Sequence, residues 1–130
     1  MTNRATLEAL LARVQEGTGQ DRELDGDLAE ALQVGGNPWK HDGDGWISVH
    51  GFGCQAAMFT RSIDAALTLV PEGKAWTVGQ NVHHWYWSAS VNALDEDGAP
   101  KSIGWGGPSN SPALALCAAA LQARMEALGE

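Results

Sequence analysis

The sequence has little cysteine, little charge and no long hydrophobic run. Its two cysteines, Cys54 and Cys117, lie far apart and lack the spacing of a metal or redox motif. We therefore expect plain thiols in a reducing compartment. No segment approaches the roughly 18 apolar residues that span a bilayer. Residues 1–16 carry charges through their apolar stretch, which indicates an amphipathic helix and not a signal peptide, so we expect a cytoplasmic protein.

Basic residues are also few. The chain has 8 lysines and arginines against 16 acidic residues, which gives a formal net charge of −8. A negative field of this kind repels phosphate backbones, so we expect no binding of long nucleic acids and no anionic membrane partner. The net charge does not exclude a single small anion, because backbone N–H groups would bind it through short-range hydrogen bonds.

What the chain does have is enough apolar sequence for one domain over residues 1–130. Apolar residues make up 44% of the sequence, which is typical of a globular chain. They recur at helical spacing in four segments. The first ends at Gly17, and the others cover about residues 21–32, 60–69 and 112–128. Asp21, Ser62 and Ser111 are suitable N-cap residues for the last three segments.

Alternating residues predict three strands, over 75–80, 84–92 and 101–105, with a turn at 95–98. They would form an antiparallel meander. Residues 35–57 are less regular, and we interpret them as a loop followed by a short strand at 46–49. The predicted class is α+β, with a small antiparallel sheet of three to four strands packed between helical layers, an α/β/α sandwich in the order α-α-(β)-α-β-β-β-α.

Three stretches together resemble a known family: RELDGDLAEAL, FTRSIDAALTLVPEG and SPALALCAAALQAR. In this order and spacing they are similar to the phage α/β/α (ABA) sandwich domain family of small phage and prophage proteins. The resemblance covers most of the chain and least of residues 35–57. It implies a compact domain with a small antiparallel sheet between helical layers, and a place in the cytoplasm of a bacterial host. It implies no activity and no set of catalytic residues.

The glycine-rich segment before the last helix is the most suggestive part of the sequence. Glycines allow close backbone approach, and the segment leads into a helix N-terminus with free N–H groups. This could form a cradle for a phosphate or carboxylate, although an ordinary turn and helix start explain the same residues. The candidate ligand-binding residues are Gly104, Trp105, Gly106, Gly107, Ser109, Asn110 and Ser111, with Tyr86 and Trp87 from the preceding strand.

Six tryptophans are many for a chain of this length. Those on the apolar faces of the predicted strands indicate core packing: Trp76, Trp85 and Trp87. Alternatively, aromatic rings of the chain are exposed and stack on a base or another planar ligand, the candidates being Tyr86, Trp39 and Trp105 in addition to those three.

Residues for catalysis or metal binding are scattered. His83 and His84 are adjacent, so on a strand they would point to opposite faces and could not easily hold one metal ion. The run at 42–45 lacks the third acidic ligand and the closing glutamate of a calcium loop. Ser62 and Asp64 suit a helix cap and a first-turn acid. We predict no catalytic residue, no metal and no cofactor.

The sequence is consistent with two candidate functions. The first is a phage accessory protein that binds and sequesters a small anionic ligand, such as a nucleotide signal of host defence. The second is a protein–protein interaction module, either an inhibitor of a host protein or a phage assembly factor. An enzyme is disfavoured because no spacing places a nucleophile beside a base. The small sheet with exposed edges and the alanine-rich last helix favour a homo-oligomer, which we expect to be a dimer.

Overall fold

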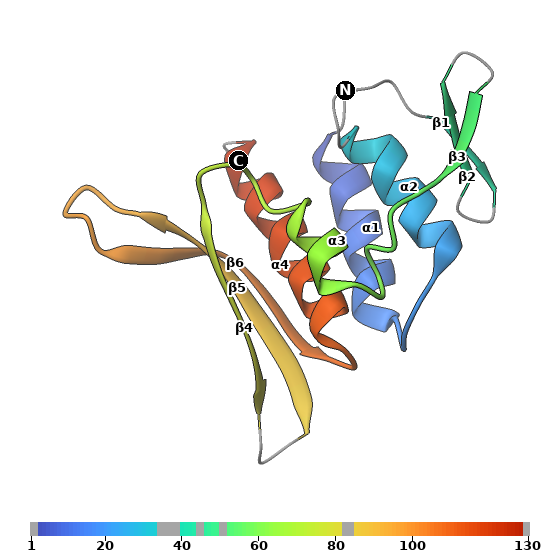
Figure 1. Ribbon diagram of the computed structural model, residues 1–130. Helices are drawn as coiled ribbons and strands as arrows, with labels where there is room; N and C mark the ends of the chain where they lie inside the picture. The colour runs from blue at the N-terminus through green and yellow to red at the C-terminus, as the bar shows by residue number, and fades with distance from the viewer. Residues whose placement is uncertain (1–2, 34–39, 44–45, 50–51, 82–84, 129–130) are drawn as a thin grey trace.

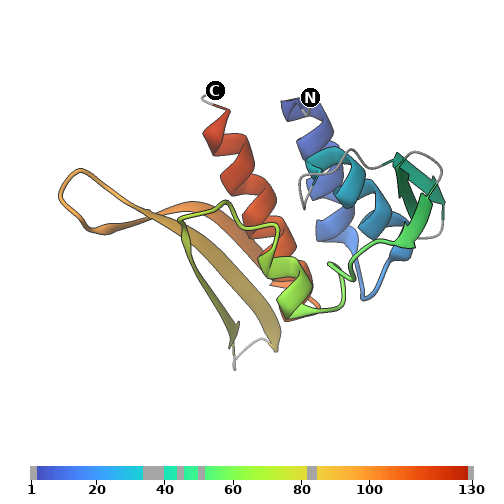
Figure 2. The same cartoon turned by 45° about the horizontal axis from the view of Figure 1, so that its top comes forward.

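The computed structural model describes residues 3–33, 40–43, 46–49, 52–81 and 85–128 of the chain. These residues form four helices and two separate three-stranded antiparallel sheets. The helices lie between the sheets, as Figures 1 and 2 show. The predicted class, α+β with a small antiparallel sheet packed against helices, is confirmed. In the described part of the chain helices cover one face of the C-terminal sheet, and the second sheet lies beyond them.

Each helix begins at a residue whose side chain accepts a hydrogen bond from the backbone N–H three residues further on. Such a cap satisfies one of the free N–H groups of the first turn. The predicted caps Asp21, Ser62 and Ser111 are confirmed, and Asn3 caps the first helix. The helices are α1 (Arg4–Glu16), α2 (Arg22–Leu32), α3 (Ile63–Leu67) and α4 (Pro112–Ala127).

The C-terminal sheet is the predicted meander. Its strands are β4 (Ala75–Asn81), β5 (Tyr86–Leu94) and β6 (Pro100–Ser109), with β5 in the centre. The β5–β6 turn forms as expected, because the Asp95 carboxylate accepts hydrogen bonds from the N–H groups of Asp97 and Ala99, each at 2.9 Å. Gly98 follows with a φ of +80°, a conformation that glycine adopts without strain.

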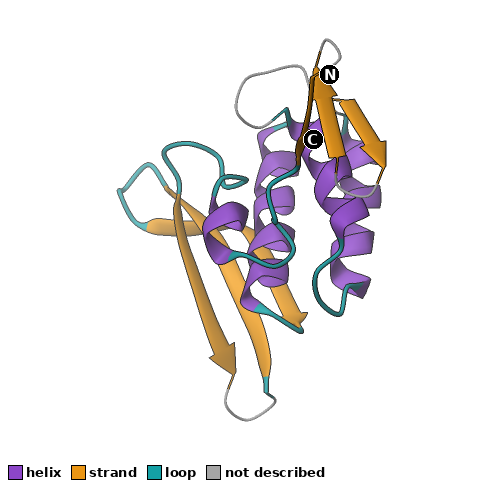
Figure 3. Ribbon diagram, turned by 45° about the vertical axis from the view of Figure 1, so that its right-hand side comes forward, coloured by secondary structure: helices purple, strands orange, loops and turns teal. Residues whose placement is uncertain are grey.

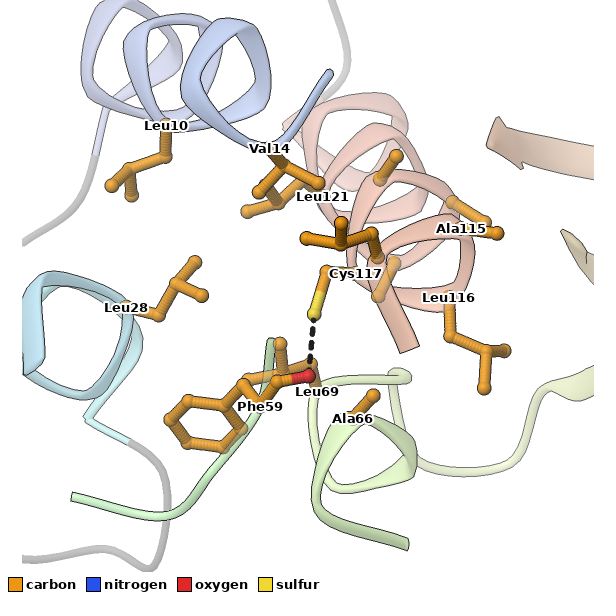
Figure 4. Packing of buried hydrophobic residues seen from close by; sticks show 14 of the residues in the cluster. Leu10, Val14, Leu28, Phe59, Ala66, Leu69, Ala115, Leu116, Cys117 and Leu121 are labelled. Carbon is orange, nitrogen blue, oxygen red and sulfur yellow. Dashed lines mark hydrogen bonds between the residues drawn. The ribbon is translucent and has the colours of Figure 1, made fainter. Parts of the chain in front are cut away.

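The helix α4 lies at the centre of the molecule. It packs on β5 and β6 with one side and on α1 and α3 with the others. All its residues from Ala113 to Leu121 are therefore buried. Figure 4 shows Cys117 among these residues, where its thiol donates a hydrogen bond to the carbonyl oxygen of Phe59 at 3.2 Å. Burial raises the pKa of this thiol far above its usual range, so Cys117 is inert.

The second sheet lies within residues 35–57, for which the sequence predicts a loop and one short strand. Its strands are β1 (Lys40–Gly43), β2 (Trp46–Val49) and β3 (Phe52–Gln55), shown in Figure 3. The predicted strand at 46–49 is confirmed, whereas the loop predicted at 40–43 is wrong. The polar sequence of β1 has no apolar alternation, and its pairing with β2 and its packing on α2 determine its conformation.

A buried carboxylate ties α2 to the segment before α3. Asp25 is fully buried and accepts hydrogen bonds from the backbone N–H and the hydroxyl of Thr60, each at 2.9 Å. It also forms an ion pair with Arg22 at 2.8 Å, and Arg22 donates a further hydrogen bond to the carbonyl oxygen of Ala56. Burial raises the pKa of Asp25 in spite of these contacts.

Candidate functional site

The structure corrects the prediction for the glycine-rich segment. Gly104–Ser109 is not a loop but the second half of β6, paired antiparallel with β5. Sequence reasoning missed this because glycine and Pro108 are unfavourable in strands. Only Asn110 and Ser111 remain between the strand and α4.

The glycines of β6 serve the contact with α4. A methyl group added at Gly104 would collide with the backbone of Ala119, and one added at Gly106 would collide with the backbone of Ala115. The alanines of α4 and the glycines of β6 thus bring helix and strand unusually close. The inner face of β6 is filled by this packing and cannot receive a ligand.

Two backbone N–H groups of the predicted anion cradle, those of Trp105 and Leu114, have partners within the protein. The N–H of Trp105 donates to the side-chain oxygen of Gln122 at 3.1 Å. At the start of α4, the N–H of Leu114 donates to the Ser111 hydroxyl at 3.2 Å, and Pro112 has no N–H. The side-chain amide of Asn110 donates to the carbonyl oxygen of Gly17 at 2.9 Å. The geometry therefore does not support a small-anion cradle here.

The predicted site residues divide between the two faces of the sheet. Strand alternation and the packing of Gly104 and Gly106 on α4 place Trp105 on the opposite, outer face. Tyr86 shares that outer face, whereas Trp87 lies on the inner face and packs against the core. Trp105 is 53% exposed. Of the two roles predicted for the tryptophans, core packing and an exposed ring, its exposure fits the second.

The outer face of the β4–β6 sheet carries a row of side chains across all three strands. Thr77, Ser90 and Trp105 stand opposite one another in β4, β5 and β6. The hydroxyls of Thr77 and Ser90 are hydrogen-bonded at 2.7 Å, and the Asn92 side chain donates to Ser90 at 3.3 Å. Ser90 is only 9% exposed, because its cross-strand neighbours flank it. The row is therefore ordered before any partner arrives.

A hollow of about 690 Å³ lies at one end of this face. Strand alternation places several of its lining residues on the outer face. Leu94, one of them, is 73% exposed. Its lining residues are Gly73, Lys74, Ala75, Thr77, Asn92, Ala93, Leu94 and Pro100. The face thus combines an aromatic ring near one end, a polar row and an apolar hollow at the other end.

The strands of this sheet are almost free of charge. Of all residues in β4, β5 and β6, Lys101 alone is charged, although the chain carries a net charge of −8. The strands of the outer face therefore offer hydrogen bonds and apolar contact, and the adjoining hollow is lined by one cation, Lys74. We define the outer sheet face as Thr77, Ser88, Ser90, Asn92 and Trp105 with the adjoining hollow.

A second polar cluster joins α1, α2 and β1, and no sequence motif predicts it. Asp27 is hydrogen-bonded to Arg13 and, at 2.7 Å, to Nδ1 of His41, while Glu30 accepts from the His41 backbone N–H at 2.8 Å. Partial burial alone would raise the pKa of Asp27, but the hydrogen bonds and charges of Arg13 and His41 lower it.

This cluster holds the β1–β3 sheet on α2 and lacks the features of a catalytic pair. The Nε2 atom of His41 is buried against Gly26 of α2 and has no hydrogen-bond partner among the described residues. A base must reach the proton that it abstracts, and this atom cannot reach a substrate. A groove of about 590 Å³ borders Asp27 and Glu30, but His41 does not line it.

Among the described residues, the remaining predicted positions give no second site. His83, His84 and Trp39 lie outside the described residues. Within the described ranges, no group of three or more potential metal ligands occurs. No helix in the part of the chain that the structure describes has the length and apolar character to cross a membrane.

Comparison with known proteins adds no relative. No family model matches the chain, and no curated protein or solved structure matches it either. The resemblance to the phage sandwich family stays a prediction. The function has to be argued from the outer sheet face itself.

Proposed function

We propose that this chain is a protein-binding module and that the outer sheet face contacts the partner. The single observation that carries the proposal is the composition of that face. No described element covers it, no charged residue of the strands interrupts its centre, and it exposes both Trp105 and an apolar hollow. Depletion of charge in the centre and enrichment in tryptophan are typical of protein–protein interfaces.

The composition also defines the partner. The expected partner surface is neutral and carries an apolar or aromatic side chain that fills the hollow. It also carries hydrogen-bond donors or acceptors that bind Thr77 and Ser90. A small anion is less favoured, because two of the N–H groups near α4, those of Trp105 and Leu114, are engaged within the protein. Together with the phage resemblance, the proposal becomes an inhibitor of a host protein or an assembly factor, acting in the bacterial cytoplasm.

The test replaces Trp105 by serine and compares its partner binding with that of the wild type. We expect the Trp105→Ser protein to bind its partner at least about tenfold more weakly, because exposed tryptophans carry much of the binding energy of an interface. The matched control is Leu128→Ser, which removes a similarly exposed apolar side chain at the end of α4. Partners retained on each immobilised variant would be quantified by mass spectrometry, and their affinities measured by titration.

The proposal requires a partner that binds the wild type and Leu128→Ser but is lost with Trp105→Ser. If every retained protein binds all three variants equally, the outer sheet face is not the binding surface. Thermal unfolding of the variants checks that Trp105→Ser is folded. Since the Trp105 side chain is more than half exposed, we expect its loss to change stability little.

A further inference from the structure

The two edge strands of the C-terminal sheet, β4 and β6, differ in how well they are protected from pairing with another strand. The β6 edge carries Pro100 and Pro108, its pairing with β5 is interrupted twice, and Gln122 of α4 caps the N–H of Trp105. Prolines, bulges and covering side chains are the usual means by which proteins prevent an edge strand from pairing with another chain. The β6 edge is thus protected.

The β4 edge has none of these protections. Its seven residues AWTVGQN contain no charge and no proline, and they pair with β5 in an unbroken register. From Ala75 to Gln80, the backbone groups that face away from β5 have no hydrogen-bond partner among the described residues. Five of these seven residues are exposed, including Trp76 at 42%. An edge of this kind is a template for another strand.

The charge distribution of the chain favours the β4 strand of a second copy as the strand that pairs with the β4 edge. A second copy of a chain with a net charge of −8 is repelled at most of the surface, but β4 is a neutral region where two copies can approach. Antiparallel self-pairing centred on Val78 places Thr77 opposite Gly79 and Trp76 opposite Gln80. No charged residue opposes another, and Gly79 has open space around it for the facing Thr77.

We propose that two copies of this chain dimerise by antiparallel pairing of their β4 strands about Val78. The two sheets then form one six-stranded sheet, and the two outer sheet faces become continuous. In each pair Trp76 packs beside Gln80 of the second copy. The edge alone buries less than the roughly 800 Å² per partner of a typical stable interface, so we expect a dissociation constant in the micromolar range.

A charge-swap experiment tests the pairing and its register. The acidic variant carries Thr77→Glu and Gly79→Glu, and the basic variant carries Thr77→Lys and Gly79→Lys. In the proposed register each variant opposes like charges in two cross-strand pairs, whereas a mixture opposes Glu to Lys in both. Both positions are exposed and Gly79 has room for a side chain, so both variants can fold.

Sedimentation velocity over about 1 µM to 1 mM measures the association. We expect the wild type to dimerise, each variant alone to dimerise at least about tenfold more weakly, and the equimolar mixture to recover the dimer. A wild type that stays monomeric at the highest concentration overturns the proposal. So do variants that dimerise as well as the wild type, or a mixture that does not recover. Circular dichroism confirms that each variant is folded.

The dimer rests on the β4 edge and not on the proposed function. Trp105 lies on β6, across β5 from that edge, so Trp105→Ser should leave the dimer intact while it abolishes partner binding. The charge-swap variants change Thr77, which belongs to the outer sheet face, so they test the dimer only, and partner binding is tested by Trp105→Ser. The two proposals can therefore fail independently.

Discussion

The helical half and the C-terminal sheet of this molecule differ in what they do with polar groups. Every helix carries at least one carboxylate, and three of the four in α2, those of Asp25, Asp27 and Glu30, are bound to Arg22, Arg13, Thr60 or His41. The strands β4–β6 carry a single charge and are packed on one face only. The helical half is thus internally satisfied, whereas the sheet keeps one face and one edge available for partners.

This difference teaches where an association site can lie in an acidic chain. A net charge of −8 keeps copies and acidic partners apart over most of the surface. A neutral sheet at one end of the molecule removes that barrier locally. If the helical half and the sheet differ in this way, substitutions in the helical half should lower stability. Substitutions on the exposed part of the sheet should weaken binding.

The largest effect is expected in the helical half, at the buried carboxylate. Replacement of Asp25 by alanine leaves Arg22 and the Thr60 N–H without their partner, in a site from which water is excluded. We expect the free energy of unfolding to fall by about 3–5 kcal/mol. The control is Asp64→Ala in the exposed first turn of α3, which should cost below about 1 kcal/mol. Urea denaturation measures both, and equal losses would contradict the role given to Asp25.

A somewhat smaller effect should appear where the two halves meet. Replacement of Gly106 by alanine forces a methyl group against the α4 backbone, and we expect a loss of about 1–3 kcal/mol. The same change at Gly79, which faces open space, should change stability by less than about 1 kcal/mol. Chemical denaturation of both variants tests this. A Gly106→Ala protein as stable as Gly79→Ala would show that helix and strand are not in close contact.

These glycines also show where sequence reasoning succeeds and where it fails. Helix caps and apolar periodicity are local signals, so all four helices and the meander could be predicted. The role of Gly104 and Gly106 depends on the alanines of α4, which are distant in sequence, and local propensity reads them as a loop. The same holds for His41, whose partner Asp27 lies on another element.

The outer sheet face was only partly visible in the sequence. Strand alternation predicts that Ser88, Ser90 and Asn92 share one side of β5, and the pairing with β4 and β6 agrees with this. That no described helix covers this side follows from how α4 packs, which residue patterns do not specify. For Trp105 the sequence predicts a place in a glycine-rich loop, whereas this residue lies in β6 on the exposed face of the sheet.

The smallest and sharpest test lies within α2 itself, since two of its carboxylates should respond to pH in opposite directions. The pKa of Asp27 is lowered, so its contacts stabilise the fold above the usual value of 3.8, and this stabilisation is lost as the pH falls through the lower folded pKa. The pKa of Asp25 is raised by burial, so the folded chain binds this proton more readily, and stability falls as the pH rises above 3.8.

The corresponding variants are Asp27→Asn and Asp25→Asn, measured by denaturation between about pH 2.5 and 7. The stability advantage of the wild type over Asp27→Asn, about 1 kcal/mol near neutrality for this partly exposed pair, should shrink towards acid. Its advantage over Asp25→Asn should grow towards acid. If both stability differences change in the same direction with pH, Asp25 and Asp27 lie in similar surroundings. The proposed contrast between the buried Asp25 and the partly exposed Asp27 is then wrong.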